Sequence, residues 1–241
     1  MIKGISALEL LHRETASTNR IKTLCRALDK MLCGGIIIGK GIVELCGVPG
    51  SGKTLLCKLL ALNIQIPKSI GGPGLNAIYI DTEGGFSKNR LREISKNTLS
   101  YIHEKNKFGN ITNKNLIENV KYIRIFDLEE LLNVLFIMPS QKIAKILENM
   151  SKEYSLSIIV TNHMTKKYID NDQKKKKEKQ PTNSIEEKYL EPSLGLSWNS
   201  LICERLILKR ERDLTLGSEI LNKISVTNSF GEIAYFKVIH F

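Results

Sequence analysis

The octapeptide Gly47–Thr54, GVPGSGKT, carries the residue types that hold a phosphate group. It fits the pattern G-x-x-x-x-G-K-[ST], in which glycines let backbone N–H groups surround a phosphate without an obstructing Cβ. Lys53 would supply a cation for the β- and γ-phosphates, and the Thr54 hydroxyl is suited to ligate Mg²⁺. An accidental glycine turn would match in only about 1% of chains of this length. The pattern therefore predicts a triphosphate site.

Hydrolysis at such a site would also need an acid that holds the metal and a base that activates water. Asp81 follows the apolar run AIYI, and Asp127 follows IRIF, so both end predicted strands. Asp127 is better explained as the N-cap of a helix, paired with Glu130. Glu83 could orient and deprotonate the attacking water, or it could be an exposed turn acid. Spacing alone leaves the roles of Asp81 and Glu83 open.

Two polar residues follow the apolar run of SLSIIVTN. Asn162 ends a predicted strand, where polar residues often face the ligand crevice of an open α/β sheet. It could equally satisfy the turn that follows. His163 could contact phosphate or DNA, although a lone histidine is more often structural.

Basic residues dominate the charge of the chain. Thirty-six Lys and Arg against 25 Asp and Glu give a net charge of +11. Such a balance favours an anionic partner, or reflects a composition in which lysines only solvate the surface. Residues 166–180 form a lysine-rich loop that could bind phosphodiesters, direct nuclear import or serve as a linker. The lysines of interest are Lys166, Lys167, Lys174, Lys175, Lys176 and Lys177.

Length and composition indicate one sizeable α/β domain, because 42% of the 241 residues are hydrophobic. The five cysteines form no C-x-x-C pair, which indicates a reducing compartment. The four histidines are scattered, so no zinc site is expected. We see neither a signal peptide nor an apolar segment of membrane-spanning length, and expect an intracellular protein without a membrane partner.

The elements that would position these residues alternate between strands and helices. Buried strands are predicted at residues 41–45, 77–81, 121–127 and 155–162. Helices are predicted at residues 5–11, 21–32, 54–64 and 88–101, after 127 and from 143. Later strands are predicted at 201–208, 220–226 and 233–239, two of which could form a hairpin. The alternation predicts an α/β fold with a mostly parallel sheet and helices on both faces.

The phrases GVPGSGKT, YIDTEGGF and IIVTNHM, in this order, resemble RecA-type recombinases. Flanking phrases, among them LCRALDKMLCGGI, LEPSLGLSW and ERLILKRE, are similar to the eukaryotic Rad-fifty-one paralogues, most of all the C-type paralogue. The resemblance runs from Ser6 onward. It implies a RecA-like P-loop NTPase core at residues 21–241, with C-terminal strands, after a linker or N-terminal helix at 1–20.

The resemblance also implies roles for individual residues. Glu83 would be the catalytic glutamate, acting with Lys53, and Asn162 the sensor. His163 replaces the usual glutamine, which relays nucleotide state to the DNA loop, and residues 166–180 would lie in the second DNA-binding loop. Mg²⁺ would be held by Thr54 and Asp81. The implied ATP contacts are Gly47, Val48, Pro49, Gly50, Ser51, Gly52, Lys53, Thr54, Leu55, Arg90 and Asn162.

Two features depart from the family pattern. The family's small N-terminal helical domain has no counterpart, and neither has the central apolar strand ending in the metal-holding aspartate. LFIMPS runs directly into QKIAKILENM, where the alternative is one helix kinked at Pro139. A missing buried strand would break the ladder of a parallel sheet. We therefore predict that ATP binds, whereas efficient hydrolysis is not predicted.

Taken together, the resemblance implies an ATP-binding, DNA-dependent recombinase paralogue of homologous recombination and double-strand-break repair in the nucleus. Its partners would be single-stranded or branched DNA and other recombinase paralogues. The alternative is a non-hydrolysing assembly module that binds those paralogues. A P-loop kinase of small molecules is a third possibility, against which the DTEGGF phrase and the basic loop both argue.

Overall fold

A computed structural model describes residues 6–8, 20–105, 111–134, 143–168, 188–194, 196–212 and 222–237. Their strands are β1 Arg20–Ile21, β2 Ile36–Ile37, β3 Ile42–Gly47, β4 Ala77–Asp81, β5 Val120–Arg124, β6 Ile158–Tyr168, β7 Lys188–Pro192, β8 Ile202–Arg212, β9 Asn222–Thr227 and β10 Ile233–Lys237. Their helices are α2 Arg26–Met31, α3 Lys53–Asn63, the 3₁₀ helix η1 Lys68–Ile70, α4 Lys88–Lys105, α5 Asn113–Glu118, α6 Leu128–Val134, α7 Ile143–Glu153 and α8 Leu196–Asn199.

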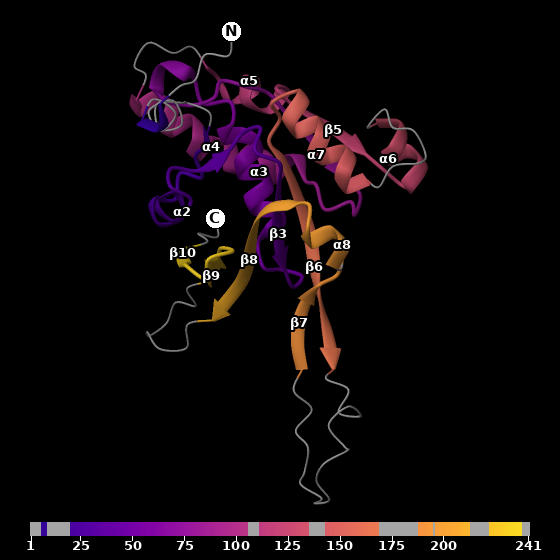
Figure 1. Ribbon diagram of the computed structural model, residues 1–241. Helices are drawn as coiled ribbons and strands as arrows, with labels where there is room; N and C mark the ends of the chain where they lie inside the picture. The colour runs from indigo at the N-terminus through magenta and orange to yellow at the C-terminus, as the bar shows by residue number, and fades with distance from the viewer. Residues whose placement is uncertain are drawn as a thin grey trace, which may run out of the picture.

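The largest sheet has the strand order β10-β9-β8-β3-β6-β7 (Figure 1). Its centre is parallel, because β3 pairs in parallel with both β6 and β8. The flanking pairs β6–β7, β8–β9 and β9–β10 are antiparallel. Every residue of β3 is buried, as an apolar strand between two parallel neighbours requires. The predicted α/β fold is confirmed, and so is a hairpin among the last strands. The sheet is not mostly parallel as predicted, because three of its five strand pairs are antiparallel.

Helices cover both faces of β3. Successive side chains of a strand point to opposite faces. Val43 and Leu45 point to the face on which buried residues of α2 and α3 pack, including Leu28, Leu56 and Leu60. Glu44 points to the other face, where it meets α8. The position of the strand between two helical layers explains why its sequence is almost wholly apolar.

The strands β4 and β5 form a separate parallel sheet, in register from Ala77 opposite Val120 to Asp81 opposite Arg124. A second core joins this sheet to α3, α4 and α5, with Leu62, Leu91, Ile94, Ile102, Leu116 and Val120 buried. In the described part of the chain between β5 and β6 there are only the helices α6 and α7. The predicted absence of a central strand stays a prediction, because residues 135–142 lie outside the described residues.

Several boundaries differ from the sequence predictions. The helix predicted at 21–32 begins only at Arg26, because Asp29 accepts hydrogen bonds from the backbone and hydroxyl of Thr23 and holds the preceding residues non-helical. The short helix α5 was not among the predicted helices, and Thr112 and Asn115 form a capping box at its start. β6 extends to Tyr168 because it pairs with β7, a strand that the sequence did not indicate.

No helix in the described residues combines the length and apolarity needed to cross a membrane. The predicted segment 1–20 lies outside the described residues apart from 6–8 and Arg20. Lys174, Lys175, Lys176 and Lys177 also lie outside them.

Candidate functional site

The predicted phosphate loop connects the end of the central strand to the start of a helix. β3 ends at Gly47, and α3 begins at Lys53 after Gly52, whose φ of 100° is left-handed. The carbonyl of Gly52 accepts the first helical hydrogen bond, from Leu56 N–H. The N–H groups of the first turn have no partners within a helix and point toward the loop, where the helix dipole favours an anion.

The glycines of the loop are required by its packing. A Cβ on Gly47 would lie 2.3 Å from Ser51 Oγ and 2.6 Å from the carbonyl oxygen of Leu208. A Cβ on Gly52 would lie 2.5 Å from Ile224 Cδ1. A Cβ on Gly50 would meet no atom within 4 Å, so the loop opens there. Only glycine therefore allows the chain to pass so close to β8 and β9.

Lys53 lies folded over the loop. Its Nζ donates to the carbonyl oxygens of Gly47 at 2.7 Å and Val48 at 3.2 Å, and the residue is only 8% exposed. Burial lowers the pKa of Lys53, and the charge of Glu83 opposes this shift. The ammonium group thus has two neutral acceptors, which phosphate oxygens could replace at the same place.

One buried hydroxyl in the loop has no protein partner. Ser51 is fully buried, and its Oγ makes no hydrogen bond within the described structure. Buried polar groups are nearly always satisfied in folded proteins. An unsatisfied hydroxyl inside a glycine loop, beside a half-buried Thr54 at the start of α3, fits a site built for a polar ligand.

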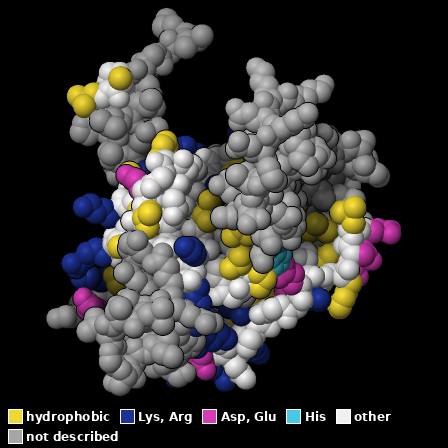
Figure 2. All heavy atoms as spheres, turned by 90° about the horizontal axis from the view of Figure 1, so that it is seen from below, with side chains coloured by type: hydrophobic (Ala, Val, Ile, Leu, Met, Phe, Trp, Pro, Cys, Tyr) yellow, Lys and Arg dark blue, Asp and Glu magenta, His cyan; other side chains and the backbone are white. Residues whose placement is uncertain are grey.

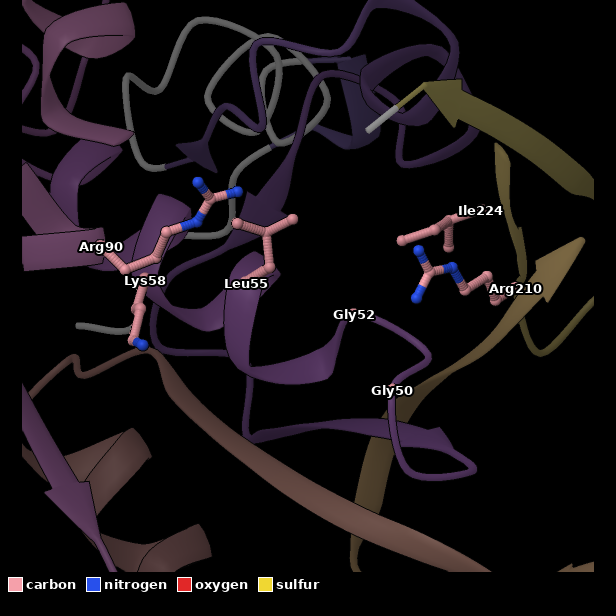
Figure 3. Close-up of a pocket in the computed structure, with 7 residues that line it drawn as sticks. All are labelled: Gly50, Gly52, Leu55, Lys58, Arg90, Arg210 and Ile224. Atoms are coloured by element: carbon pink, nitrogen blue, oxygen red, sulfur yellow. The ribbon is translucent and has the colours of Figure 1, made fainter. Parts of the chain in front are cut away.

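A pocket adjoins the loop and brings together residues from the stretch 50–90 with two residues of the C-terminal strands (Figure 3). Three of its side chains are cationic, which favours an anionic ligand. In Figure 3, Arg90 and Lys58 belong to the helices on one side, whereas Arg210 and Ile224 belong to the C-terminal strands on the other. The lining residues are Gly50, Gly52, Leu55, Lys58, Arg90, Arg210 and Ile224. Four of them, Gly50, Gly52, Leu55 and Arg90, were predicted to contact the ligand.

Lys58, Arg210 and Ile224 were not predicted. Lys58 could have been found from the sequence, because it is the single charged residue in the otherwise apolar helix sequence LLCKLLAL. Lys58 is 3% exposed, donates to the carbonyl of Gly85 at 3.2 Å, and lies over the ring of Phe86 at 5.3 Å. Burial lowers its pKa. Arg210 lies on β8, within the phrase ERLILKRE that supported the resemblance but was given no role in the site, and Ile224 lies on β9.

Asp81 organises the turn that carries Glu83. Its oxygens accept bonds from three backbone N–H groups and one hydroxyl: Glu83 at 3.2 Å, Gly84 at 2.8 Å, Phe86 at 3.1 Å and Tyr122 Oη at 3.2 Å. Arg124 Nη1 adds an ion pair at 3.5 Å. Burial would raise the pKa of Asp81, but the hydrogen bonds outweigh it and lower the pKa. These contacts distinguish Asp81 from Glu83, although its predicted Mg²⁺ ligation stays a prediction.

The Glu83 side chain is 62% exposed and available for chemistry. Its Oε1 lies 2.6 Å from Nε2 of His163, at the end of the part of β6 that pairs with β3. The two residues are 80 positions apart in the chain. The structure therefore joins the turn after β4 to β6, and it gives the predicted catalytic glutamate a histidine partner.

Asn162 is not among the pocket-lining residues. It is 4% exposed, and its Nδ2 donates to Oε1 of the buried Glu44 at 2.8 Å. Its predicted contact with a nucleotide stays a prediction. Glu44 itself was missed, although a single acid within the apolar run IVELCG was the signal that could have revealed it.

The remaining predicted residues have simpler surroundings. Asp127 accepts from Glu130 N–H at 2.8 Å, which confirms that it caps α6. Lys166 and Lys167 lie in β6 opposite Leu190 and Tyr189 of β7. In the described residues, no three His, Cys, Asp or Glu residues gather as metal ligands would. Lys and Arg side chains gather on the face seen in Figure 2.

The phosphate loop and the Glu83 turn both fall within the stretch, residues 14–145, that matches the sequence model of the Rad51 family. The chain belongs to the Rad51 family. Two relatives are named DNA repair protein RAD51 homolog 3. The one from Cricetulus griseus is 30% identical over 87% of this chain, and the one from Dictyostelium discoideum is 29% identical over 85%. This Rad51-family chain spans 65% and 61% of their respective lengths. The predicted resemblance is confirmed.

Proposed function

We propose that this Rad51-family chain binds ATP and acts on DNA in homologous recombination and DNA repair. The observation that carries the proposal is the glycine loop between β3 and α3, with Lys53 lying over it and a cationic pocket beside it. The names of the relatives, as DNA repair proteins, support the biological setting. The nucleus is the compartment that this role requires.

The residues present fit ATP with Mg²⁺. The loop leaves no space for a Cβ at Gly47 or Gly52, contains the unsatisfied Ser51 hydroxyl, and ends at a helix N-terminus. Backbone N–H groups from Gly50 onward would hold the phosphates, Lys53 would neutralise them, and the Thr54 hydroxyl would ligate the metal. Bound Mg²⁺ would supply additional neutralisation of the phosphate charge.

Glu83 is the residue that we assign to activating water. Its carboxylate is exposed, and Asp81 fixes the surrounding turn by accepting from the N–H groups of Glu83, Gly84 and Phe86. His163 holds one carboxylate oxygen and so limits the positions that the side chain adopts. In this proposal Asp81 positions the turn, and Thr54 is the side chain on which metal binding chiefly depends.

The β6–β7 hairpin is the part of the chain that we assign to DNA. Lys166 and Lys167 lie near the end of β6, and the basic run at residues 174–177 lies between β6 and β7 in the sequence. Clustered lysines bind phosphodiester backbones by displacing counterions, without regard to sequence. Single-stranded or branched DNA would be the partner, together with other recombinase paralogues.

The test of the nucleotide site is Lys53→Ala, with Lys114→Ala as the matched control. Lys114 is an exposed lysine of α5 that pairs only with Glu118 in the described structure. A charged hydrogen bond contributes about 1.5–3 kcal/mol, so Lys53→Ala should weaken binding of radiolabelled ATP by about 10- to 100-fold. Lys114→Ala should bind as the unmodified chain does. Equal affinity in all three proteins would refute the site assignment.

The divided sheet favours a second candidate function. β4 has only β5 as a strand neighbour in the described structure, which departs from a continuous ATPase sheet. A chain built in this way would serve as a non-hydrolysing module that assembles with partner paralogues, with nucleotide as a structural ligand. Phosphate release that is stimulated by single-stranded DNA would exclude this candidate.

A further inference from the structure

A fully buried carboxylate lies in the middle of the strand that leads to the phosphate loop. Glu44 is 0% exposed, and its Oε1 accepts from Asn162 Nδ2 at 2.8 Å and from Trp198 Nε1 at 2.7 Å. Its Oε2 accepts from Arg205 Nε at 2.5 Å. The three donors belong to β6, α8 and β8. One side chain therefore holds three separate elements against β3.

The arrangement follows from the sheet register. Glu44 lies opposite Val160 on β6 and Arg205 on β8, so Asn162 is two residues further along the same face. Taking a carboxylate out of water is costly, and an apolar side chain of similar volume often serves stability as well or better. The buried charge is therefore better explained by where it places its partners than by the stability it adds.

The network reaches both predicted catalytic residues. Glu44 precedes by three positions Gly47, whose carbonyl accepts from Lys53 Nζ at 2.7 Å. Asn162 is followed directly by His163, whose Nε2 is 2.6 Å from Glu83. Glu44 therefore lies three residues from the Gly47 carbonyl along β3, and it contacts Asn162, the residue before the histidine that meets Glu83.

The same network fixes the β7–α8 segment, residues 188–199. Ser193 N–H and Oγ both donate to the carbonyl of His163, at 3.0 and 2.9 Å. Further along, Trp198 donates to Glu44, and Arg205 Nη2 donates to Asn199 at 2.5 Å. The segment is therefore attached to β6 along the β7 strand and at Ser193, and to β3 and β8 through Trp198 and Asn199, while β7 belongs to the hairpin that we assign to DNA.

We propose that Glu44 is a positioning residue that couples occupancy of the phosphate loop to the β7–α8 segment, through Asn162 and Trp198. This proposal rests on ATP binding at the loop. A phosphate that draws Lys53 away from the Gly47 carbonyl alters the end of β3, and the shared carboxylate passes this change to both donors. The β6–β7 hairpin would then respond to nucleotide.

The chain provides its own reporter, because Trp198 is its single tryptophan. The full-length chain is titrated with radiolabelled ATPγS and Mg²⁺, and bound label and tryptophan emission are recorded on the same samples. In the unmodified chain we expect a saturable emission change whose midpoint equals the Kd from bound label. The coupling is overturned if the chain binds label and its emission does not change.

The variant is Glu44→Gln, which keeps the size of the side chain and removes its charge. The control is Glu104→Gln, in a glutamate whose side chain is 71% exposed at the end of α4. Glu44→Gln should bind label within about 3-fold of the unmodified chain and lose at least half of the emission change. If Glu44 had a purely structural role, the substitution would lower ATPγS binding and the tryptophan emission change together. An emission change that equals that of Glu104→Gln overturns the proposal.

Hydrogen exchange of the unmodified chain tests the coupling should Glu44→Gln not fold. Backbone amides of residues 188–199 should change their exchange rates by at least about 5-fold when ATPγS binds. If the chain binds radiolabelled ATPγS and the exchange rates of residues 188–199 do not change, the coupling is overturned while the proposed function stands. A chain that binds no label overturns the proposed function, and the coupling falls with it.

Discussion

Asp81→Asn is the substitution that most directly tests how the Glu83 turn is held. The carboxylate is 5% exposed and accepts three backbone N–H bonds and the Tyr122 hydroxyl. In asparagine one oxygen becomes an NH₂ group, which cannot accept hydrogen bonds. Whichever way the amide is oriented, donors on one side of the turn lose their acceptor.

The size of the effect follows from the number of lost bonds. A hydrogen bond to a charged group contributes about 1.5–3 kcal/mol, and each oxygen of Asp81 serves at least two donors. We expect Asp81→Asn to lower the free energy of unfolding by about 3 kcal/mol or more at neutral pH. For a chain of this size, that corresponds to a Tm lower by about 6–12 °C.

The pH dependence gives an independent check. The pKa of Asp81 is lowered in the folded chain, so its contribution to stability is complete above the ordinary aspartate pKa of about 4. The contribution is lost as the pH falls through the lowered pKa of the folded state. Urea titrations at several pH values should therefore show that the unmodified chain and Asp81→Asn differ less in free energy of unfolding below about pH 4.

Asp127→Asn is the matched control, because Asp127 also follows a strand and also accepts a backbone N–H bond. Asparagine caps helices as well as aspartate does, so this variant should change stability by less than about 0.5 kcal/mol. If Asp81→Asn lowers the free energy of unfolding no more than Asp127→Asn does, the reasoning about the turn is refuted.

Two further predictions concern the basic run and the thiols. Replacing the lysines at 174–177 with glutamine should weaken DNA binding and reduce its salt dependence. The slope of log K against log salt should fall by about 0.7 for each lost contact with single-stranded DNA. Fluorescence anisotropy measures both the affinity and the slope, and an unchanged slope would remove the run from the DNA site. Burial, reinforced by Glu44, raises the pKa of Cys46 to about 12, so at pH 8 iodoacetamide should modify the exposed Cys33 first. Modification of Cys46 ahead of Cys33, read by mass spectrometry, would contradict its burial.

Local sequence signals predicted the elements next to the phosphate loop. β4 has the predicted bounds, residues 77–81, and α3 begins and ends one residue before the predicted 54–64. In both, a short apolar pattern beside a glycine turn is a local signal that the sequence displays by itself. The cap at Asp127 was predictable for the same reason.

Long-range partners explain what the sequence could not predict. The donors to Glu44 are 118, 154 and 161 positions away, so its polar network has no local signature. Arg210 and Ile224 reach the pocket only because the antiparallel strands β8 and β9 extend the sheet past the loop. β7 was missed because its partner β6 lies on the other side of residues 169–187, whose sequence has no strand pattern.

The division of the sheet also bears on how Glu83 moves. Glu83 follows a strand of the small sheet, whereas His163 belongs to the large one, and the bond between their side chains spans the two. Because no backbone ladder joins these sheets in the described residues, side-chain contacts and α3 keep them in alignment. A small rotation of β4 and β5 about α3 would therefore separate the Glu83 carboxylate from the His163 ring. It would break no hydrogen bonds between paired strands.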